Sequence, residues 1–154
     1  MISVEKNNNG AVIWLNRPEK KNALNKDMIL RMMEVLNELE NEDTVRYVVI
    51  RGKGEVFSAG ADINWMKESS GNGKKDNYAD AKLLATFFHQ IYHYSKPTIA
   101  IVHGMAIGGA VGVMAACDVA YCSEETLFAF SEVKLGIIPA TISPFILKRI
   151  REFY

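Results

Sequence analysis

Two short segments of small residues and one glutamate are the parts of this sequence that could do chemistry. The first segment is Gly104-Met105-Ala106-Ile107-Gly108-Gly109-Ala110, where an apolar run gives way to a helix of small residues. Glycines at the start of a helix let a ligand approach bare backbone, and the free N–H groups and the helix dipole there favour negative charge. The segment could therefore hold a developing oxyanion, or it could only let the helix pack closely on a sheet. It is not a phosphate loop, because the Gly-Lys-Ser/Thr ending is missing.

The second segment is Phe57-Ser58-Ala59-Gly60-Ala61-Asp62, which follows a predicted buried strand and could present another backbone N–H. The glutamate is Glu132, which lies between an apolar strand and the turn Gly136-Ile137-Ile138-Pro139. Apolar surroundings disfavour the charged form of a carboxylate, which suits proton transfer near neutral pH. The alternative is a glutamate that caps a helix or forms an ion pair.

Two other patterns point away from common active sites. His89 and His93 share one face of a predicted helix, as zinc ligands do, but no glutamate between them and no third ligand is evident. We therefore expect no metal. The sequence also has no Gly-x-Ser-x-Gly elbow, so Ser58 and Ser131 are poor candidates for a nucleophile.

Composition indicates one ordinary domain with a sizeable core. The chain has 154 residues, 49% of them hydrophobic, with 18 basic and 18 acidic side chains. A net charge of zero gives no reason to expect nucleic acid or an anionic membrane as a partner. The two cysteines, Cys117 and Cys122, are expected to be small buried hydrophobic residues in a reducing or indifferent compartment.

No targeting or membrane segment is predicted. Residues 1–10 contain Glu5, Lys6 and three asparagines where a signal peptide needs an apolar core, so we expect a cytoplasmic location. The stretch from Thr98 to Cys117 has the length of a membrane span, but its glycines divide it into a strand, a turn and a helix.

Strands and helices alternate along the chain, which predicts an α/β fold with parallel strand pairing. The exception is an N-terminal hairpin around an Asn-Gly turn. Asn25 is the expected N-cap of the first helix, and Ser69–Asp76 is the expected loop, open to motion. Strands are predicted at 47–50, 98–102, 119–122 and 127–130, and helices at 26–40, at 78–94, at 108–117 and from Ser143 onward.

Five motifs in this order resemble the crotonase (enoyl-CoA hydratase/isomerase) superfamily, and together they cover nearly the whole chain. They are Asn16-Arg17-Pro18 with Asn22-Ala23-Leu24, the segment 57–62, His103 to Ala110, Cys117-Asp118, and Ser131 to Pro139. The resemblance implies a crotonase-like spiral of ββα units that binds an acyl-CoA thioester. It implies no separate cofactor, because coenzyme A is part of the substrate.

The resemblance also implies roles for individual residues. The backbone N–H groups of Ala61 and Gly109 would hold the thioester oxygen, and Glu132 would act as the acid and base. The coenzyme A would run past Ala59 to Ile63, with two lysines near its phosphates. The full set of implied substrate contacts is Lys20, Lys21, Ala23, Ala59, Asp62, Ile63, Gly108 and Gly112.

The sequence departs from the usual hydratase pattern at one position. Typical hydratases carry a first glutamate on the helix after the double glycine, where this chain has Gly112. With Glu132 alone, hydration and double-bond isomerisation both stay open. Asp62 to Met66 and Pro139 to Phe145 further resemble a bacterial branch of methylglutaconyl-CoA hydratases and their isohexenyl- or geranyl-type relatives.

The family also continues beyond the point where this chain stops, into C-terminal helices that close the acyl pocket and build trimers or hexamers. We therefore expect residues 1–154 to form an N-terminal acyl-CoA-binding domain, C-terminally truncated, with an exposed apolar face. Three functions follow: a hydratase-like lyase, an enoyl-CoA isomerase, and a catalytically silent CoA-binding or interaction protein.

Overall fold

A five-stranded sheet forms the centre of the computed structural model, which describes residues 1–149 and all of their side chains except those of Ser70, Lys134 and Leu135. The last five residues of the predicted domain therefore lie outside the described residues. β1 and β2 are antiparallel, and every other pairing in this sheet is parallel. In spatial order the strands are β1 (Ile2–Lys6), β2 (Gly10–Leu15), β3 (Tyr47–Gly52), β4 (Thr98–Val102) and β6 (Val119–Cys122).

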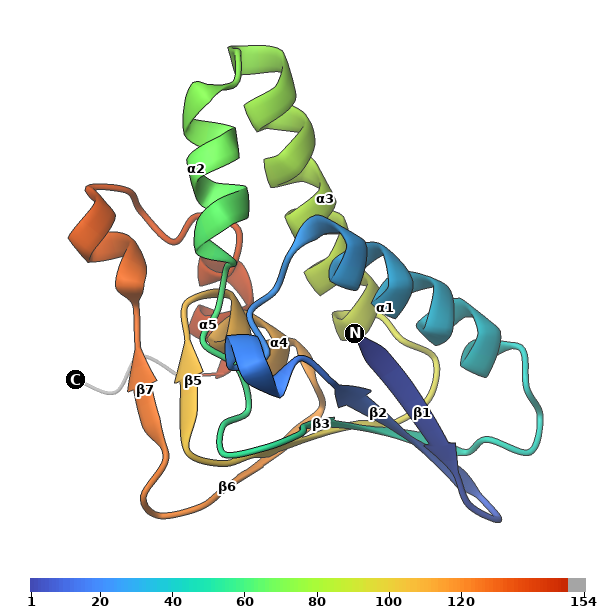
Figure 1. Cartoon of the computed structure of the whole chain (residues 1–154). Coiled ribbons are helices and arrows are strands. Elements are labelled where there is room, and N and C mark those ends of the chain that lie inside the picture. Colours follow the sequence, from blue (N-terminus) through green and yellow to red (C-terminus); the bar gives the residue numbers. More distant parts are fainter. Residues whose placement is uncertain (150–154) are drawn as a thin grey trace.

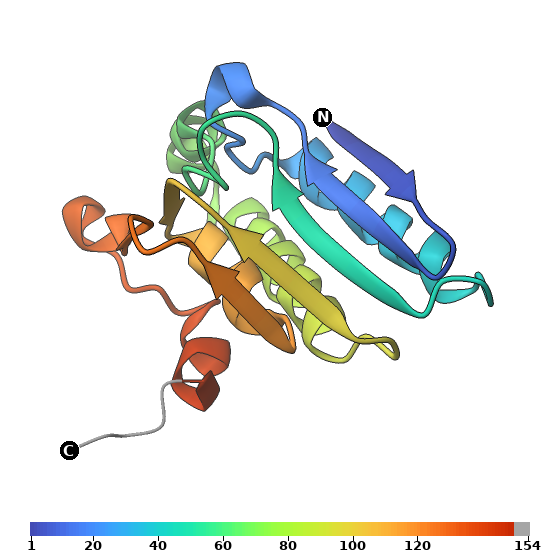
Figure 2. The ribbon, with the colours of Figure 1, turned by 90° about the horizontal axis from the view of Figure 1, so that it is seen from below.

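A second, two-stranded sheet pairs β5 (Met105–Ile107) with β7 (Leu127–Ala129) in parallel, away from the larger sheet (Figure 1). Helices α1 (Lys26–Glu40), α3 (Lys74–Tyr92) and α4 (Gly109–Ala116) cover one face of the larger sheet (Figure 2). The remaining helical elements are α2 (Ile63–Gly71), α5 (Ser143–Arg149) and the 3-10 helices η1 (Pro18–Lys20) and η2 (Ser131–Leu135).

The core lies between the larger sheet and these helices. Ile13 and Ile50 from the strands are fully buried, as are Met28 and Leu36 of α1 and Phe87 of α3. Burial of such side chains is the main favourable term in folding. On β3, Val48, Val49 and Ile50 are buried on both faces of the sheet, which confirms the prediction for that strand.

Local signals in the sequence agree with most of these elements. The predicted N-terminal hairpin is present and pairs Ile2 with Leu15 and Lys6 with Ala11, but its turn is made by residues 7–9, because Gly10 is the first residue of β2 and has no positive φ. Asn25 caps α1, because its Oδ1 accepts a hydrogen bond from the Met28 N–H at 3.0 Å. The stretch from Thr98 to Cys117 divides into β4, β5 and α4, and none of the described helices is long and apolar enough to cross a membrane.

The prediction of a loop at Ser69–Asp76 is wrong. α2 continues to Gly71 and α3 begins at Lys74, so only two residues separate the helices. The reason is a contact across the turn: the Ser69 hydroxyl and the Trp65 indole N–H both donate to Asp80 Oδ2, at 3.0 and 3.1 Å. These bonds hold α2 against α3 in spite of the polar, glycine-containing sequence between them.

The two cysteines differ from each other. Cys117 is buried, as expected, and burial raises the pKa of its thiol to about 12. Cys122 is exposed, so the prediction of a buried residue is wrong there. It lies on β6, which is the edge strand of the larger sheet and has exposed residues throughout.

Large exposed apolar side chains gather in the last third of the described chain, where an exposed apolar face was expected. They all follow residue 118, on β6, β7, η2 and the segments after them. The residues are Val119, Tyr121, Leu127, Phe128, Phe130, Val133, Ile137, Ile138 and Leu147.

Candidate functional site

The small parallel sheet brings the glycine-rich turn next to Glu132. β5 pairs with β7 so that Ile107 lies opposite Ala129, and the Gly108 N–H donates to the Ala129 carbonyl at 2.8 Å. Each strand is followed directly by a helical element: Gly108 and Gly109 start α4 after β5, and Ser131 and Glu132 start η2 after β7. Parallel pairing explains how residues so far apart in sequence share one site.

The carboxylate of Glu132 lies directly against Gly108. A methyl group at Gly108 would stand 3.0 Å from Glu132 Oε1, 3.2 Å from Oε2 and 3.3 Å from the Ser131 hydroxyl oxygen. Gly108 also has a φ of +49°, a conformation that favours glycine. Gly108 therefore gives the carboxylate and the hydroxyl their place beside the start of α4.

Glu132 is not held by a structural partner in the described part of the chain. Its Oε2 atom is shielded from solvent and has no hydrogen-bond partner there, and no salt bridge to a described residue includes it. The N-terminus of η2 has no side-chain cap either. The geometry gives no support to the alternative of a capping or ion-paired glutamate, and buried polar atoms without partners are uncommon enough to need an explanation.

Two backbone N–H groups, those of Gly109 and Ala61, donate to no carbonyl among the described residues. Gly109 is the first residue of α4, so its N–H has no intrahelical acceptor. Ala61 forms an isolated parallel bridge with Leu24, in which the flanking Gly60 carbonyl and Asp62 N–H make the hydrogen bonds at 2.7 and 2.9 Å. Leu24 makes both hydrogen bonds with the neighbours of Ala61 and none with Ala61 itself. In this pattern the Ala61 N–H points away from Leu24.

Gly60 brings the Ala61 and Gly109 segments together. A methyl group at Gly60 would lie 2.4 Å from the Ile107 carbonyl oxygen and 3.7 Å from the Gly109 nitrogen, and Gly60 has a φ of +85°. Only a glycine permits this close approach of two backbones. The segment carrying the Ala61 N–H thus runs alongside the start of α4.

The segment before Ala61 is fixed by a buried asparagine that sequence reasoning noted only as part of a motif. Asn22 is fully buried and donates to the carbonyls of Lys53 and Val56 at 2.8 and 2.9 Å. Ser58 donates to the Asn22 carbonyl at 2.8 Å and accepts from the Gly60 N–H at 3.1 Å. Ser58 is therefore a buried structural hydroxyl, as its lack of a nucleophile motif suggested.

Asp62, an expected substrate contact, is engaged in an ion pair. Its Oδ2 lies 3.0 Å from Arg17 Nη1, and its Oδ1 accepts from the Asn64 N–H at 2.9 Å, which caps α2. Burial acts to raise the pKa of this carboxyl, but the Asn64 N–H and Arg17 outweigh it and hold the pKa below its usual value. Arg17 also donates to the Ala23 carbonyl within the first motif, so its ion pair with Asp62 ties that motif to segment 57–62.

The expected coenzyme A contacts at η1 and in segment 59–63 differ in exposure. Lys20 and Lys21 are exposed at η1, and the Lys21 carbonyl accepts from the Ala59 N–H at 2.9 Å. Ala23 is buried, whereas Ile63 is 68% exposed at the start of α2. The structure thus brings the lysine backbone to Ala59, and the binding roles of these residues stay predictions.

Gly112 lies inside the packing of α4 rather than on an open surface. A methyl group there would stand 2.4 Å from Ile142 Cγ2 and 3.0 Å from two ring carbons of Phe88. The space into which a longer side chain would project is filled by these apolar groups. The expected contact between Gly112 and a substrate stays a prediction, and access to it would require Ile142 to move.

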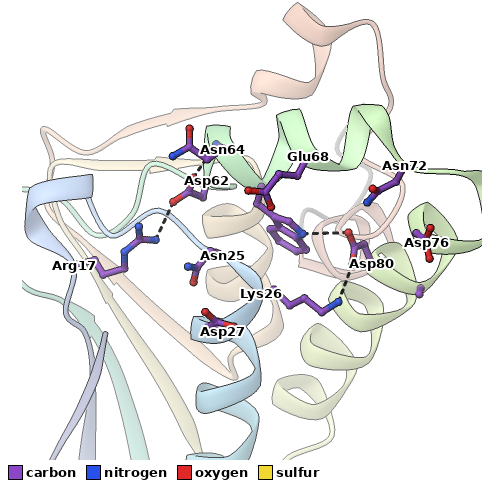
Figure 3. Close-up of a pocket in the computed structure, with 12 residues that line it drawn as sticks. Arg17, Asn25, Lys26, Asp27, Asp62, Asn64, Glu68, Asn72, Asp76 and Asp80 are labelled. Carbon is purple, nitrogen blue, oxygen red and sulfur yellow. Dashed lines mark hydrogen bonds and ion pairs between the residues drawn. The ribbon is translucent and has the colours of Figure 1, made fainter.

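A separate polar pocket of about 580 Å³ lies between α1, α2 and α3 (Figure 3). Glu132 and Gly109 are not among its lining residues. Asp80 points into it and binds Lys26 at 3.5 Å and the Trp65 indole at 3.1 Å. Its five carboxylates outnumber its two cations, Arg17 and Lys26, so it does not suit the phosphates of a nucleotide.

The chemistry of the Glu132 site follows from these groups. Backbone donors aimed at one oxygen stabilise the negative charge that develops on a carbonyl, each by about 3 kcal/mol of barrier. A nearby carboxylate without a structural partner can take up and return a proton. The arrangement suits proton transfer next to a carbonyl that becomes an enolate.

Comparisons with known proteins agree with this chemistry. Residues 5–151 match the family model "Enoyl-CoA hydratase/isomerase". A short-chain-enoyl-CoA hydratase of Clostridium acetobutylicum is 39% identical over 140 residues, which are 90% of this chain and 52% of that protein. The human mitochondrial Delta(3,5)-Delta(2,4)-dienoyl-CoA isomerase is 36% identical over 133 residues, 81% of this chain and 40% of that protein.

Solved structures agree as well. An enoyl-CoA hydratase from Shewanella pealeana superposes with a TM-score of 0.93 at 38% identity, over 96% of this chain and 56% of that one. The chain spans 40–60% of the length of the curated relatives it matches. Its fold is the crotonase fold, and the chain belongs to the enoyl-CoA hydratase/isomerase family.

Proposed function

We propose that this chain adds water to, or removes it from, the α,β double bond of an enoyl-CoA, as a hydratase-like lyase. Glu132 is the acid and base, and the N–H groups of Ala61 and Gly109 hold the thioester oxygen. One observation carries the proposal: a carboxylate with a buried, unpartnered oxygen lies against Gly108, next to the free N–H of Gly109.

The proposed hydration needs one carboxylate in two steps. Glu132 takes a proton from water while the water oxygen bonds to the β-carbon, and the π electrons move to the thioester oxygen as an enolate. The two N–H groups stabilise this enolate. Glu132 then returns the proton to the α-carbon, so that one water is added and the carboxylate is regenerated.

Binding of coenzyme A is proposed along segment 59–63. Lys20 and Lys21 are exposed cations beside Ala59 and suit the phosphates. Ile63 is exposed at the adjacent start of α2. We propose a branched substrate of the methylglutaconyl-CoA type on the resemblance of residues 62–66 and 139–145, with no metal and no cofactor beyond the CoA of the substrate.

Enoyl-CoA isomerisation is the second candidate, and the surroundings of Gly112 favour it. The place of a second carboxylate is taken by Ile142 and Phe88. A single carboxylate suits a reaction that takes a proton from one carbon and returns it to another, without water. The relatives include both hydratases and an isomerase.

The exposed apolar side chains on β6, β7 and η2 bear on assembly. We propose that they are covered in a homotrimer or hexamer, or by further polypeptide, because so large an apolar surface is unfavourable in water. If this cover is required for the acyl pocket, the chain alone is a silent CoA-binding protein.

An isotope experiment separates the three functions. The purified chain is mixed with methylglutaconyl-CoA in ¹⁸O-labelled water, and the enone absorbance and product mass are followed. Loss of absorbance with ¹⁸O in the product supports the lyase. A shifted double bond without ¹⁸O supports the isomerase, and binding without change at saturating protein supports the silent protein.

A further inference from the structure

The Ser131 hydroxyl lies together with the Glu132 carboxylate beside Gly108. Its hydroxyl oxygen would lie 3.3 Å from a methyl group at Gly108, and the two carboxylate oxygens of Glu132 would lie 3.0 and 3.2 Å from the same point. The three oxygens therefore surround a single position at the start of α4.

The Ser131 side chain is half-buried on η2, and no hydrogen bond to another described residue occupies it. It differs in this from Ser58, whose hydroxyl is used twice in the backbone scaffold, and from Ser143, which donates to the Pro139 carbonyl at 2.7 Å. The Ser131 hydroxyl and the Glu132 carboxylate thus both have hydrogen-bonding capacity to spare at this position.

We propose that Ser131 is a positioning residue that orients the attacking water, an inference that rests on the proposed hydration. A water between the two side chains gives one hydrogen to Glu132 and donates the other to Ser131 Oγ. Its lone pair then faces the β-carbon, to which the new C–O bond forms while the proton goes to Glu132. The hydroxyl orients the water, which the apolar groups around Gly112 cannot do. The hydroxyl itself undergoes no net chemical change.

The proposal separates two activities that both use Glu132. Hydration needs an oriented water. Exchange of the α-hydrogen of a saturated thioester such as isovaleryl-CoA in D₂O needs only the carboxylate and the backbone donors. Ser131 should therefore matter for the first activity and not for the second.

The test compares Ser131→Ala and Ser131→Thr with wild type in both assays. We expect Ser131→Ala to lower kcat for hydration about tenfold, the effect of one neutral hydrogen bond, with KM and the α-exchange rate unchanged. Ser131→Thr, which keeps the hydroxyl, should restore most of kcat. Ser131→Cys puts a larger, weakly hydrogen-bonding thiol in place of the hydroxyl and should resemble Ser131→Ala. Ser3→Ala on β1 is the control for loss of a remote half-buried hydroxyl.

Three results would overturn the inference. Undiminished hydration by Ser131→Ala would remove the role of the hydroxyl while leaving the proposed function intact. An equal fall in hydration and exchange would show that Ser131 acts only through the placement of Glu132. Exchange without any hydration by the wild-type chain would remove the proposed lyase function, and the water-orienting role would fall with it.

Discussion

The two polar regions of this molecule differ in how their carboxylates are satisfied. In the pocket between α1, α2 and α3, Asp80 accepts from Trp65 and Ser69 and lies 3.5 Å from Lys26 Nζ, and Asp62 is paired with Arg17. At the start of α4, Glu132 has a buried oxygen without a partner in the described chain. Asp62 and Asp80 in the pocket thus have cationic and hydrogen-bonding partners, whereas Glu132 has unused hydrogen-bonding capacity.

The difference teaches that volume and polarity alone do not identify a reactive site. A carboxylate that accepts hydrogen bonds from several protein donors has its charge balanced by the protein. Its structural role is then a sufficient reason for its position. An unsatisfied carboxylate beside free N–H groups costs stability, and groups of this kind cluster at functional sites.

The largest expected effect is the loss of turnover in Glu132→Gln. Glutamine keeps the shape of the side chain but cannot carry the proton, so we expect turnover to fall about 10²- to 10⁴-fold. Binding of a CoA thioester, measured by calorimetry, should be unchanged. Asp80→Asn is the control from the polar pocket, and an equal loss of turnover in that variant would break the distinction between the two regions.

Gly60→Ala should disturb the oxyanion site next most strongly. The added methyl group would meet the Ile107 carbonyl at 2.4 Å in a left-handed conformation, and we expect a loss of about 1–3 kcal/mol in unfolding free energy. Turnover should fall further than stability explains, because the Ala61 N–H is displaced. The matched control is Gly71→Ala on α2, where no atom lies within 4 Å of the new methyl group; thermal melts and assays on both variants check this.

A carboxylate at position 112 should not restore a two-glutamate site by itself. In Gly112→Glu the new side chain would meet Ile142 and Phe88, so we expect about 1–3 kcal/mol of destabilisation and no gain in crotonyl-CoA hydration. Adding Ile142→Ala should relieve part of the clash, which a double-mutant cycle of melting curves measures. A stable, more active single variant would show that the packing around Gly112 opens easily.

The smallest effect concerns Asp62, whose carboxyl is a structural group by this comparison. Because its pKa is lower in the folded chain, its ionised form stabilises the fold at neutral pH, and this stabilisation is lost as the pH falls through the folded pKa. Asp62→Asn should cost about 1 kcal/mol at pH 7. The difference in melting temperature from wild type should shrink below about pH 4, the ordinary range of an aspartate; a constant difference would contradict the assigned cause.

Local chemistry in the sequence predicted much of the fold. The N-terminal hairpin, the Asn25 cap and the β-branched runs appear as expected, because each depends on neighbours in the chain. The prediction of a loop at 69–76 was wrong because hydrogen bonds from α2 to Asp80, which is distant in sequence, outweigh the loop-like composition. Exposure of Cys122 depends on which strand lies at the sheet edge, which no local pattern encodes.

The candidate site was foreseen as residue types and motif order, but its spatial detail was not. Nothing local indicates that Ser131 and Glu132 meet at Gly108, since this follows from the register of β5 with β7. The packing of Ile142 on Gly112 likewise joins α4 to a segment 30 residues later. Such contacts are set by tertiary pairing, which a single sequence does not specify.

A crystal structure of the chain with an unreactive acyl-CoA thioester tests the central claim most directly. We expect the thioester oxygen about 2.7–3.1 Å from the nitrogens of Ala61 and Gly109, with the α-carbon facing the Glu132 carboxylate. The acyl thioester bound instead in the polar pocket between α1, α2 and α3, away from Glu132, would contradict the account.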